Sequence, residues 1–235
     1  MVGALILMGL LFRFPSFNGL STQLTTGFEE LFLSVILLLI NSYYVHQPLY
    51  FTTTLTPTDQ LSLGWPALLV AGYAAGVGVL SLKSVAALGL TLLVALLVSL
   101  FEELLFRGLI FKLLVPDFTA AQTTVLTGAA LSSLLFSLTH LVNLTHQSWT
   151  LTLLQLLFTF AIGMLLCGLY QYTRSLWWPL AIHTLNDFFS FSQPTINLPL
   201  INTTTAFQLF EIIIIVILTV ILFRTAASRS TSKPN

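Results

Sequence analysis

The chain has 235 residues, of which 56% are hydrophobic and 7% are charged, and its formal net charge is zero. A soluble domain carries about 25% charged residues, so this chain cannot cover a globular surface with polar groups. The zero net charge gives no sign of a nucleic-acid partner, and the single cysteine, Cys167, excludes an internal disulfide. The composition therefore predicts an integral, multi-pass membrane protein.

The apolar stretches are continuous and have nearly the ~20 residues that a spanning helix needs, which favours helices over a barrel. We expect an all-α transmembrane bundle of about eight helices, or seven if the short segment 1–14 does not span the membrane. The other predicted helices cover residues 28–45, 63–80, 83–115, 121–142, 149–172, 176–191 and 207–223. One membrane domain would occupy residues 1–235, with a motif-bearing core at about 83–191 and a polar tail at 224–235.

The first acidic pair, Glu29 and Glu30, falls at the start of the predicted helix 28–45. The helix dipole favours negative charge at this end. We interpret the pair as a structural cap, because the residue four positions after Glu30 is Ser34 and not a basic partner.

The second acidic pair lies inside the long apolar segment 83–115, where Glu102 and Glu103 are followed by Arg107. Ionisable groups inside a membrane helix are costly and indicate a functional site by default. Glu103 and Arg107 are four positions apart and can pair along one helix face. The segment is longer than the ~30 Å apolar core of a bilayer, so it must tilt, kink or protrude.

Two later helices carry possible partners for these glutamates. Helix 121–142 contains Phe136 and His140, and helix 176–191 contains His183, Asn186 and Asp187. We expect these side chains and the glutamates to converge in a polar pocket where the three helices meet, facing the bundle and not the lipid.

A carboxylate and an imidazole that share one water can remove its proton and make it a nucleophile. A second histidine with a neighbouring amide or acid can stabilise the oxyanion that forms when this water attacks a carbonyl. A metal is the competing account, because Glu102, His140 and His183 form a His₂Glu zinc set. The residues alone leave both accounts open.

Three motifs in order resemble the signature of the CAAX-protease and bacteriocin-processing (Abi/CPBP) family of intramembrane proteases. The motifs are Glu102-Glu103-x-x-x-Arg107, Phe136-x-x-x-His140 and His183-x-x-x-Asp187. The resemblance implies an eight-helix membrane endopeptidase in which Glu102 and His140 activate water, while His183 and residue 187 stabilise the oxyanion. It also implies glutamic-type chemistry, so we expect no cofactor, with zinc as the alternative.

Position 187 departs from the eukaryotic prenyl-protein proteases of this family, which have Asn where this chain has Asp187. An ionised Asp cannot donate a hydrogen bond to an oxyanion. Three alternatives follow: Asp187 is protonated, it orients His183, or Asn186 takes the role of donor.

The expected function is hydrolysis of a peptide or membrane-protein substrate, in a pocket open to the cytoplasm. The alternatives are a non-catalytic scaffold or subunit of a larger membrane complex, and a small ion-coupled transporter. Basic residues are concentrated on the cytoplasmic side of membrane proteins. One side of the predicted bundle collects Lys112, Arg174, Arg224, Arg229 and Lys233, whereas the other collects Arg13 and Lys83. This asymmetry predicts a cytoplasmic C-terminus.

Overall fold

The computed structural model describes residues 21–82, 84–192 and 201–231, with the side chains of the last helix described between 208 and 226. The described chain contains seven long helices and no strand, which confirms the predicted all-α bundle. They are α2 (Thr22–Ile40), α3 (Pro57–Ser81), α4 (Val85–Glu103), α6 (Gln122–Thr139), α7 (Trp149–Thr173), α8 (Trp177–Ser192) and α9 (Ile201–Thr231). The predicted first segment, residues 1–14, lies outside the described residues.

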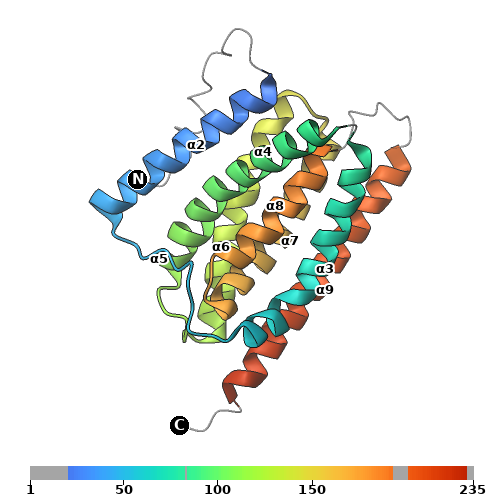
Figure 1. Ribbon diagram of the computed structural model, residues 1–235. Helices are drawn as coiled ribbons and strands as arrows, with labels where there is room; N and C mark the ends of the chain where they lie inside the picture. Colours follow the sequence, from blue (N-terminus) through green and yellow to red (C-terminus); the bar gives the residue numbers. More distant parts are fainter. Residues whose placement is uncertain (1–20, 83, 193–200, 232–235) are drawn as a thin grey trace.

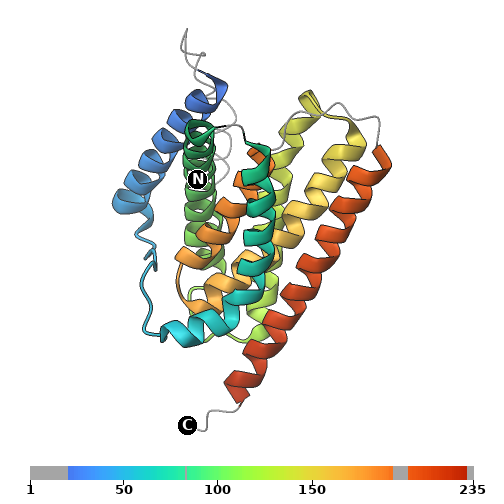
Figure 2. The ribbon, with the colours of Figure 1, turned by 45° about the vertical axis from the view of Figure 1, so that its right-hand side comes forward.

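The helices pack as two rows (Figure 1). In one row α4 lies between α2 and α8, and α3 packs against the other side of α8. In the second row α7 packs against both α6 and α9, and it also contacts α8. Figure 2 shows α2 and α9 at opposite edges of the molecule, so α4, α7 and α8 form its centre.

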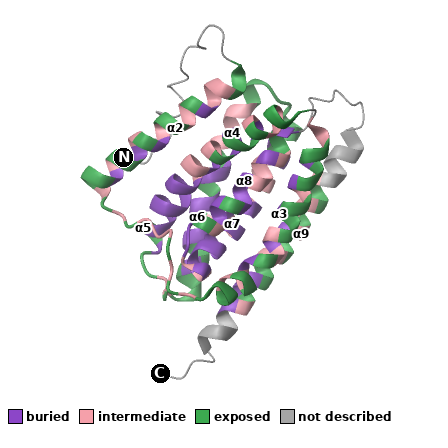
Figure 3. Ribbon diagram, viewed as in Figure 1, coloured by how far each residue is buried: buried purple, intermediate pink, exposed green. Residues whose placement is uncertain are grey.

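The surface of the bundle is apolar, as expected of a protein in lipid. Figure 3 shows that buried residues gather in the central helices, whereas α2, α3 and α9 carry many exposed ones. Large apolar side chains are exposed on these outer helices, including Leu39, Leu80 and Ile213. In the part of the chain that the structure describes, six helical segments are long and apolar enough to cross a membrane; α8, with 16 residues, is not among them. The chain is therefore an integral, multi-pass membrane protein by length and composition.

Helix α2 begins at Thr22, six residues before the predicted start. Ser21 caps it, because its Oγ accepts a hydrogen bond from the backbone N–H of Leu24 at 3.4 Å. Such a cap satisfies one of the free N–H groups of the first turn. Glu29 and Glu30 consequently lie inside α2, and the prediction that they cap its N-terminus is wrong.

Helix α3 also begins before its predicted start, at Pro57. The Thr56 side chain accepts a hydrogen bond from the backbone N–H of Asp59 at 3.2 Å, and Pro57 occupies the first position of the helix. Proline suits this position because its missing N–H is not needed there. The sequence Thr-Pro-x-Asp therefore starts a helix at a place where we expected the end of a loop.

The predicted helix 83–115 is one helical segment, Val85–Leu114, but its winding changes inside the motif. Helix α4 ends at Glu103, a π-helical segment, η2, covers Leu104–Phe111, and a short helix, α5, covers Lys112–Leu114. All residues of η2 are buried. π-Helical turns are rare in proteins as a whole, but those that occur are often found at functional sites. Here the wider winding begins directly after the two glutamates and includes Arg107.

Lys112, the first residue of α5, is buried against the turn that follows this helix. Lys112 is fully buried, and its Nζ lies 3.6 Å from the centre of the Phe118 ring and 3.4 Å from Gln171 Oε1. A cation over an aromatic face is stabilised by the ring's quadrupole. Nearby, hydrogen bonds from Thr119 to the carboxylate lower the pKa of Asp117 below its usual value. This end of the bundle is therefore closely packed.

The last helices differ from prediction mainly at their ends. Helix α6 ends at Thr139, and His140 begins a 3₁₀ segment, η3, that reaches Thr145. Helices α7 and α8 agree with the predicted ranges to within one residue. Helix α9 continues to Thr231, so the first part of the predicted polar tail is helical.

Candidate functional site

Glu103 is the centre of a hydrogen-bonded network between α4 and α8. Its Oε1 accepts hydrogen bonds from Arg107 Nη1 at 2.7 Å and from His183 Nδ1 at 2.6 Å. The side chains of Glu103 and Arg107 are 0% exposed, so each charge is removed from solvent and neutralised by the other. The pair predicted from the four-residue spacing is therefore present, and it also holds a histidine from the neighbouring helix.

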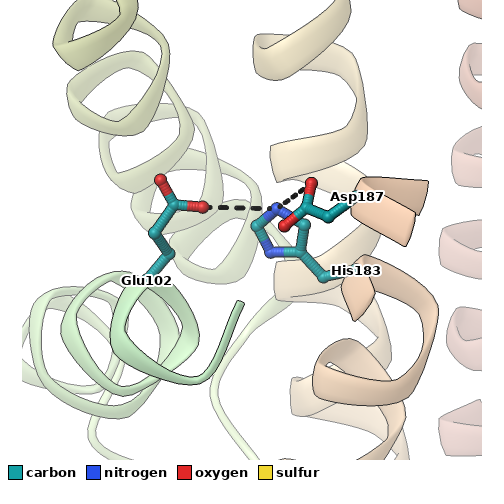
Figure 4. Close-up of side chains that lie close together, drawn as sticks. All are labelled: Glu102, His183 and Asp187. Carbon is teal, nitrogen blue, oxygen red and sulfur yellow. Dashed lines mark ion pairs between the residues drawn. The ribbon is translucent and has the colours of Figure 1, made fainter. Parts of the chain in front are cut away.

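The second ring nitrogen of His183 faces two further carboxylates. Its Nε2 lies 3.4 Å from Glu102 Oε2 and 3.6 Å from Asp187 Oδ1. Figure 4 shows the three side chains pointing toward one another, Glu102 from α4 and the other two from α8. Because a carboxylate only accepts hydrogen bonds, the Glu103 contact places a proton on Nδ1 of His183. Nε2 is then the nitrogen that remains for a ligand.

Asp187 is held from α4 by a residue that we did not predict. Ser99, which is fully buried, donates a hydrogen bond from Oγ to Asp187 Oδ2 at 2.8 Å. Asn186, which we considered as a hydrogen-bond donor, has its side chain next to Asp187 and interacts with it. The only signal for Ser99 in the sequence is its position four residues before Glu103, on the same face of the helix.

Phe136 connects the two histidines of the motifs. Its ring makes edge contacts with His140 and with His183, at centroid distances of 5.1 Å and 5.6 Å. The guanidinium carbon of Arg107 lies 4.6 Å from the same ring centre. The structure thus brings Glu102, Glu103, Arg107, His183 and Asp187 together directly, and His140 joins them through Phe136.

The position of His140 at the end of α6 determines which of its nitrogens is free. His140 Nδ1 lies 3.1 Å from the backbone carbonyl oxygen of Phe136. A carbonyl only accepts, so Nδ1 is the donor in this contact and carries the proton. In the neutral ring, Nε2 of His140 is then unprotonated and can accept a proton or a hydrogen bond.

Glu30 is a second residue near the site that sequence reasoning missed. On α2 it lies three residues after Gly27 and four before Ser34, both of which are buried, so it shares their face. Its Oε2 is buried without a hydrogen-bond partner, and it interacts electrostatically with Glu102 and Asp187. The spacing of small and polar residues along α2 was the available signal, and the interpretation of Glu30 as a cap hid it.

The cluster of Glu102, His183 and Asp187 also fits a metal ion. One ligand atom from each residue lies within 4.8 Å of the other two. The Nε2–oxygen distances of 3.4 and 3.6 Å resemble the separation of ligands that each bind zinc at about 2.0–2.2 Å. Metal-binding histidines commonly donate their other N–H to a carboxylate, as His183 does to Glu103. This cluster shares Glu102 and His183 with the zinc set that we predicted, whose third member, His140, stays a prediction.

His140 and the end of α9 lie toward opposite ends of the bundle. His140 is at the end of α6 that is remote from the α5–α6 turn, and Glu102 and Asp187 are 21% and 13% exposed. Phe223, near the end of α9, packs against Gly168, near the end of α7. We had expected a pocket open to the cytoplasm together with a cytoplasmic tail. Both the cytoplasmic opening of the pocket and the cytoplasmic C-terminus stay predictions.

Comparison with protein families matches residues 84–189 to the family described as Type II CAAX prenyl endopeptidase Rce1-like. No curated protein matches the chain. The matched region begins at Ser84, which caps α4, and ends inside α8, so it includes all three motifs. Helices α2, α3 and α9 lie outside it. The chain therefore carries, at residues 84–189, an Rce1-like domain of the CAAX-protease (CPBP) family that its motifs resemble.

Proposed function

We propose that this protein is an intramembrane endopeptidase that uses a water activated by Glu102 and His140. The observation that carries this proposal is the cluster of Glu102, His183 and Asp187 inside the family-matched region. Glu102 is the most exposed member of the cluster, on a helix whose other polar residues, Thr91, Ser99 and Glu103, are buried. Such a carboxylate is available to a water and to a substrate, whereas Glu103 is already committed to Arg107 and His183.

In this mechanism Glu102 takes a proton from the water while the water oxygen attacks the carbonyl carbon of the peptide bond. The same proton passes from Glu102 to the leaving nitrogen when the C–N bond breaks, so the carboxylate is regenerated. His140, with its unprotonated Nε2, is the second acceptor for the water. Phe136 holds His140 near the cluster through their ring contact.

The oxyanion is stabilised by His183. Glu103 keeps the proton on Nδ1, so a proton on Nε2 makes the ring a cation that can donate to the oxyanion. Asp187 accepts a hydrogen bond from Ser99 and faces Nε2 with its other oxygen. Among the three alternatives for Asp187, these contacts favour the orientation of His183.

A divalent metal, if bound, would be held by Glu102, His183 and Asp187 and would supply Lewis-acid chemistry at this place. Glu103 would then fix the imidazole through Nδ1, and Ser99 would fix the Asp187 carboxylate. The contacts of the surrounding residues are the same in both accounts.

The alternative function is a non-catalytic scaffold that keeps the family fold. The observation in its favour is that the contacts of Glu103 join α4 to α8 in the buried centre of the bundle. A scaffold would need these contacts for stability and would not need the exposed carboxylate of Glu102.

Reconstitution into liposomes separates the two functions. The purified protein is incubated with a set of membrane-spanning peptides, and new peptide ends are identified by mass spectrometry. An endopeptidase produces ends that increase with time and with the amount of protein. A scaffold leaves every peptide intact and instead copurifies with other membrane proteins in a fixed ratio.

A further inference from the structure

Ser99 is the one polar side chain in the last two turns of α4 before the glutamates. The residues around it, from Leu92 to Phe101, are otherwise apolar. A serine inside a helix commonly bonds back to a carbonyl of the preceding turn. Ser99 instead donates its hydrogen bond across the helix interface to Asp187, at 2.8 Å. Its hydroxyl therefore joins two helices that are distant in sequence.

The contact belongs to a regular arrangement of four residues. Ser99 and Glu103 are one turn apart on α4, and His183 and Asp187 are one turn apart on α8. Ser99 holds Asp187, and Glu103 holds His183 at 2.6 Å, so two hydrogen bonds link the helices at successive turns. Between them Asp187 Oδ1 faces His183 Nε2 at 3.6 Å.

We propose that Ser99 is a positioning residue that holds one oxygen of Asp187 so that the other faces Nε2 of His183. Without this hydrogen bond the carboxylate can rotate about its terminal torsion, which is broad for Asp. The imidazole would then lose a neighbour on the nitrogen that faces Glu102 and the substrate. The effect on turnover rests on the proposed function, whereas the effect on His183 does not.

The first test uses the spectrum of the histidines. The chain has four histidines, so ¹⁵N-histidine labelling gives a small set of signals, and a His183→Gln variant assigns those of His183. Ser99→Ala should shift the His183 Nε2 signal, and Ser99→Thr, which keeps the hydroxyl, should restore it. The matched control is Ser137→Ala, because buried Ser137 also donates one hydrogen bond, to the carbonyl of Leu156 at 2.7 Å. Unchanged His183 signals in Ser99→Ala would overturn the proposal.

The second test uses turnover. Ser99→Ala should lower kcat by roughly 10-fold, a typical effect of losing a residue that supports a site residue, with KM nearly unchanged. In an Asp187→Ala background the same substitution should have no further effect, since residues that act through one another are not additive. Independent losses in the double variant would contradict the proposal. If the native protein cleaves nothing, the proposed function fails, and the histidine spectrum still decides the role of Ser99.

Discussion

Glu103 and His183 face each other across the interface of α4 and α8, with Oε1 and Nδ1 2.6 Å apart. This contact determines which imidazole nitrogen is left for chemistry. It also gives Glu103 two partners, since Arg107 binds the same oxygen. The two adjacent glutamates therefore have different surroundings, and substitution of each should have a different result.

Glu103→Gln should destabilise the protein, because it leaves Arg107 buried without its carboxylate. Breaking a buried ion pair on one side costs about 3–5 kcal/mol. Glu102→Gln is the matched comparison, since it makes the same chemical change one residue earlier at a partly exposed position. Unfolding in mixed micelles with increasing SDS measures both. Equal stability of the two variants would contradict the structural role of Glu103.

Glu30→Gln should have the opposite sign and stabilise the protein, by roughly 1 kcal/mol, the usual scale of single substitutions. The reason is that Glu30 has a buried oxygen without a hydrogen-bond partner and lies near the carboxylates of Glu102 and Asp187. The control is Glu211→Gln, the same acid-to-amide change at a half-buried residue of α9. A fall in stability in Glu30→Gln alone would show that its carboxylate makes a favourable contact.

The sequence predicted the helices and the motif residues better than it predicted helix ends and contacts. Hydropathy identifies long apolar runs, but Ser21 and Thr56 extend α2 and α3 into polar sequence through capping hydrogen bonds. The pairing of Glu103 with Arg107 follows from spacing along one helix. Its pairing with His183 depends on how α4 packs against α8, which a single sequence does not show.

The same limitation explains the two residues that were missed. Ser99 and Glu30 lie outside the three motifs, and each is recognisable only from the side of its helix that is buried. Without the packing of α2 and α8 against α4, a lone serine in an apolar run and an acidic pair near a helix start have simpler interpretations.

Metal analysis should find no tightly bound zinc, because the family resemblance implies glutamic-type chemistry. The measurement is elemental analysis of the purified protein, with activity recorded before and after a chelator. Activity that survives the chelator agrees with a water activated by acid and base. About one zinc per chain that is lost in Asp187→Ala but kept in His140→Ala would instead assign the metal to the cluster of Glu102, His183 and Asp187.

Membrane orientation can be read with two engineered cysteines at opposite ends of the bundle. Thr58 lies at the start of α3, near the end of α9, and Gln147 lies between α6 and α7; both are exposed. Native Cys167 is buried and should not react. If the C-terminus is cytoplasmic, an impermeant maleimide should label Gln147→Cys in intact cells and Thr58→Cys only after permeabilisation. The reverse pattern would place the C-terminal tail outside.

The most direct test of the account is peptide cleavage by Glu102→Gln in liposomes, compared with the native protein and with Glu211→Gln. The substitution keeps the size of the side chain and removes the group that accepts the proton from water. Glu102→Gln should fold and insert normally but produce no new peptide ends, while Glu211→Gln should cleave like the native protein. Cleavage by Glu102→Gln at the native rate would contradict water activation by this carboxylate.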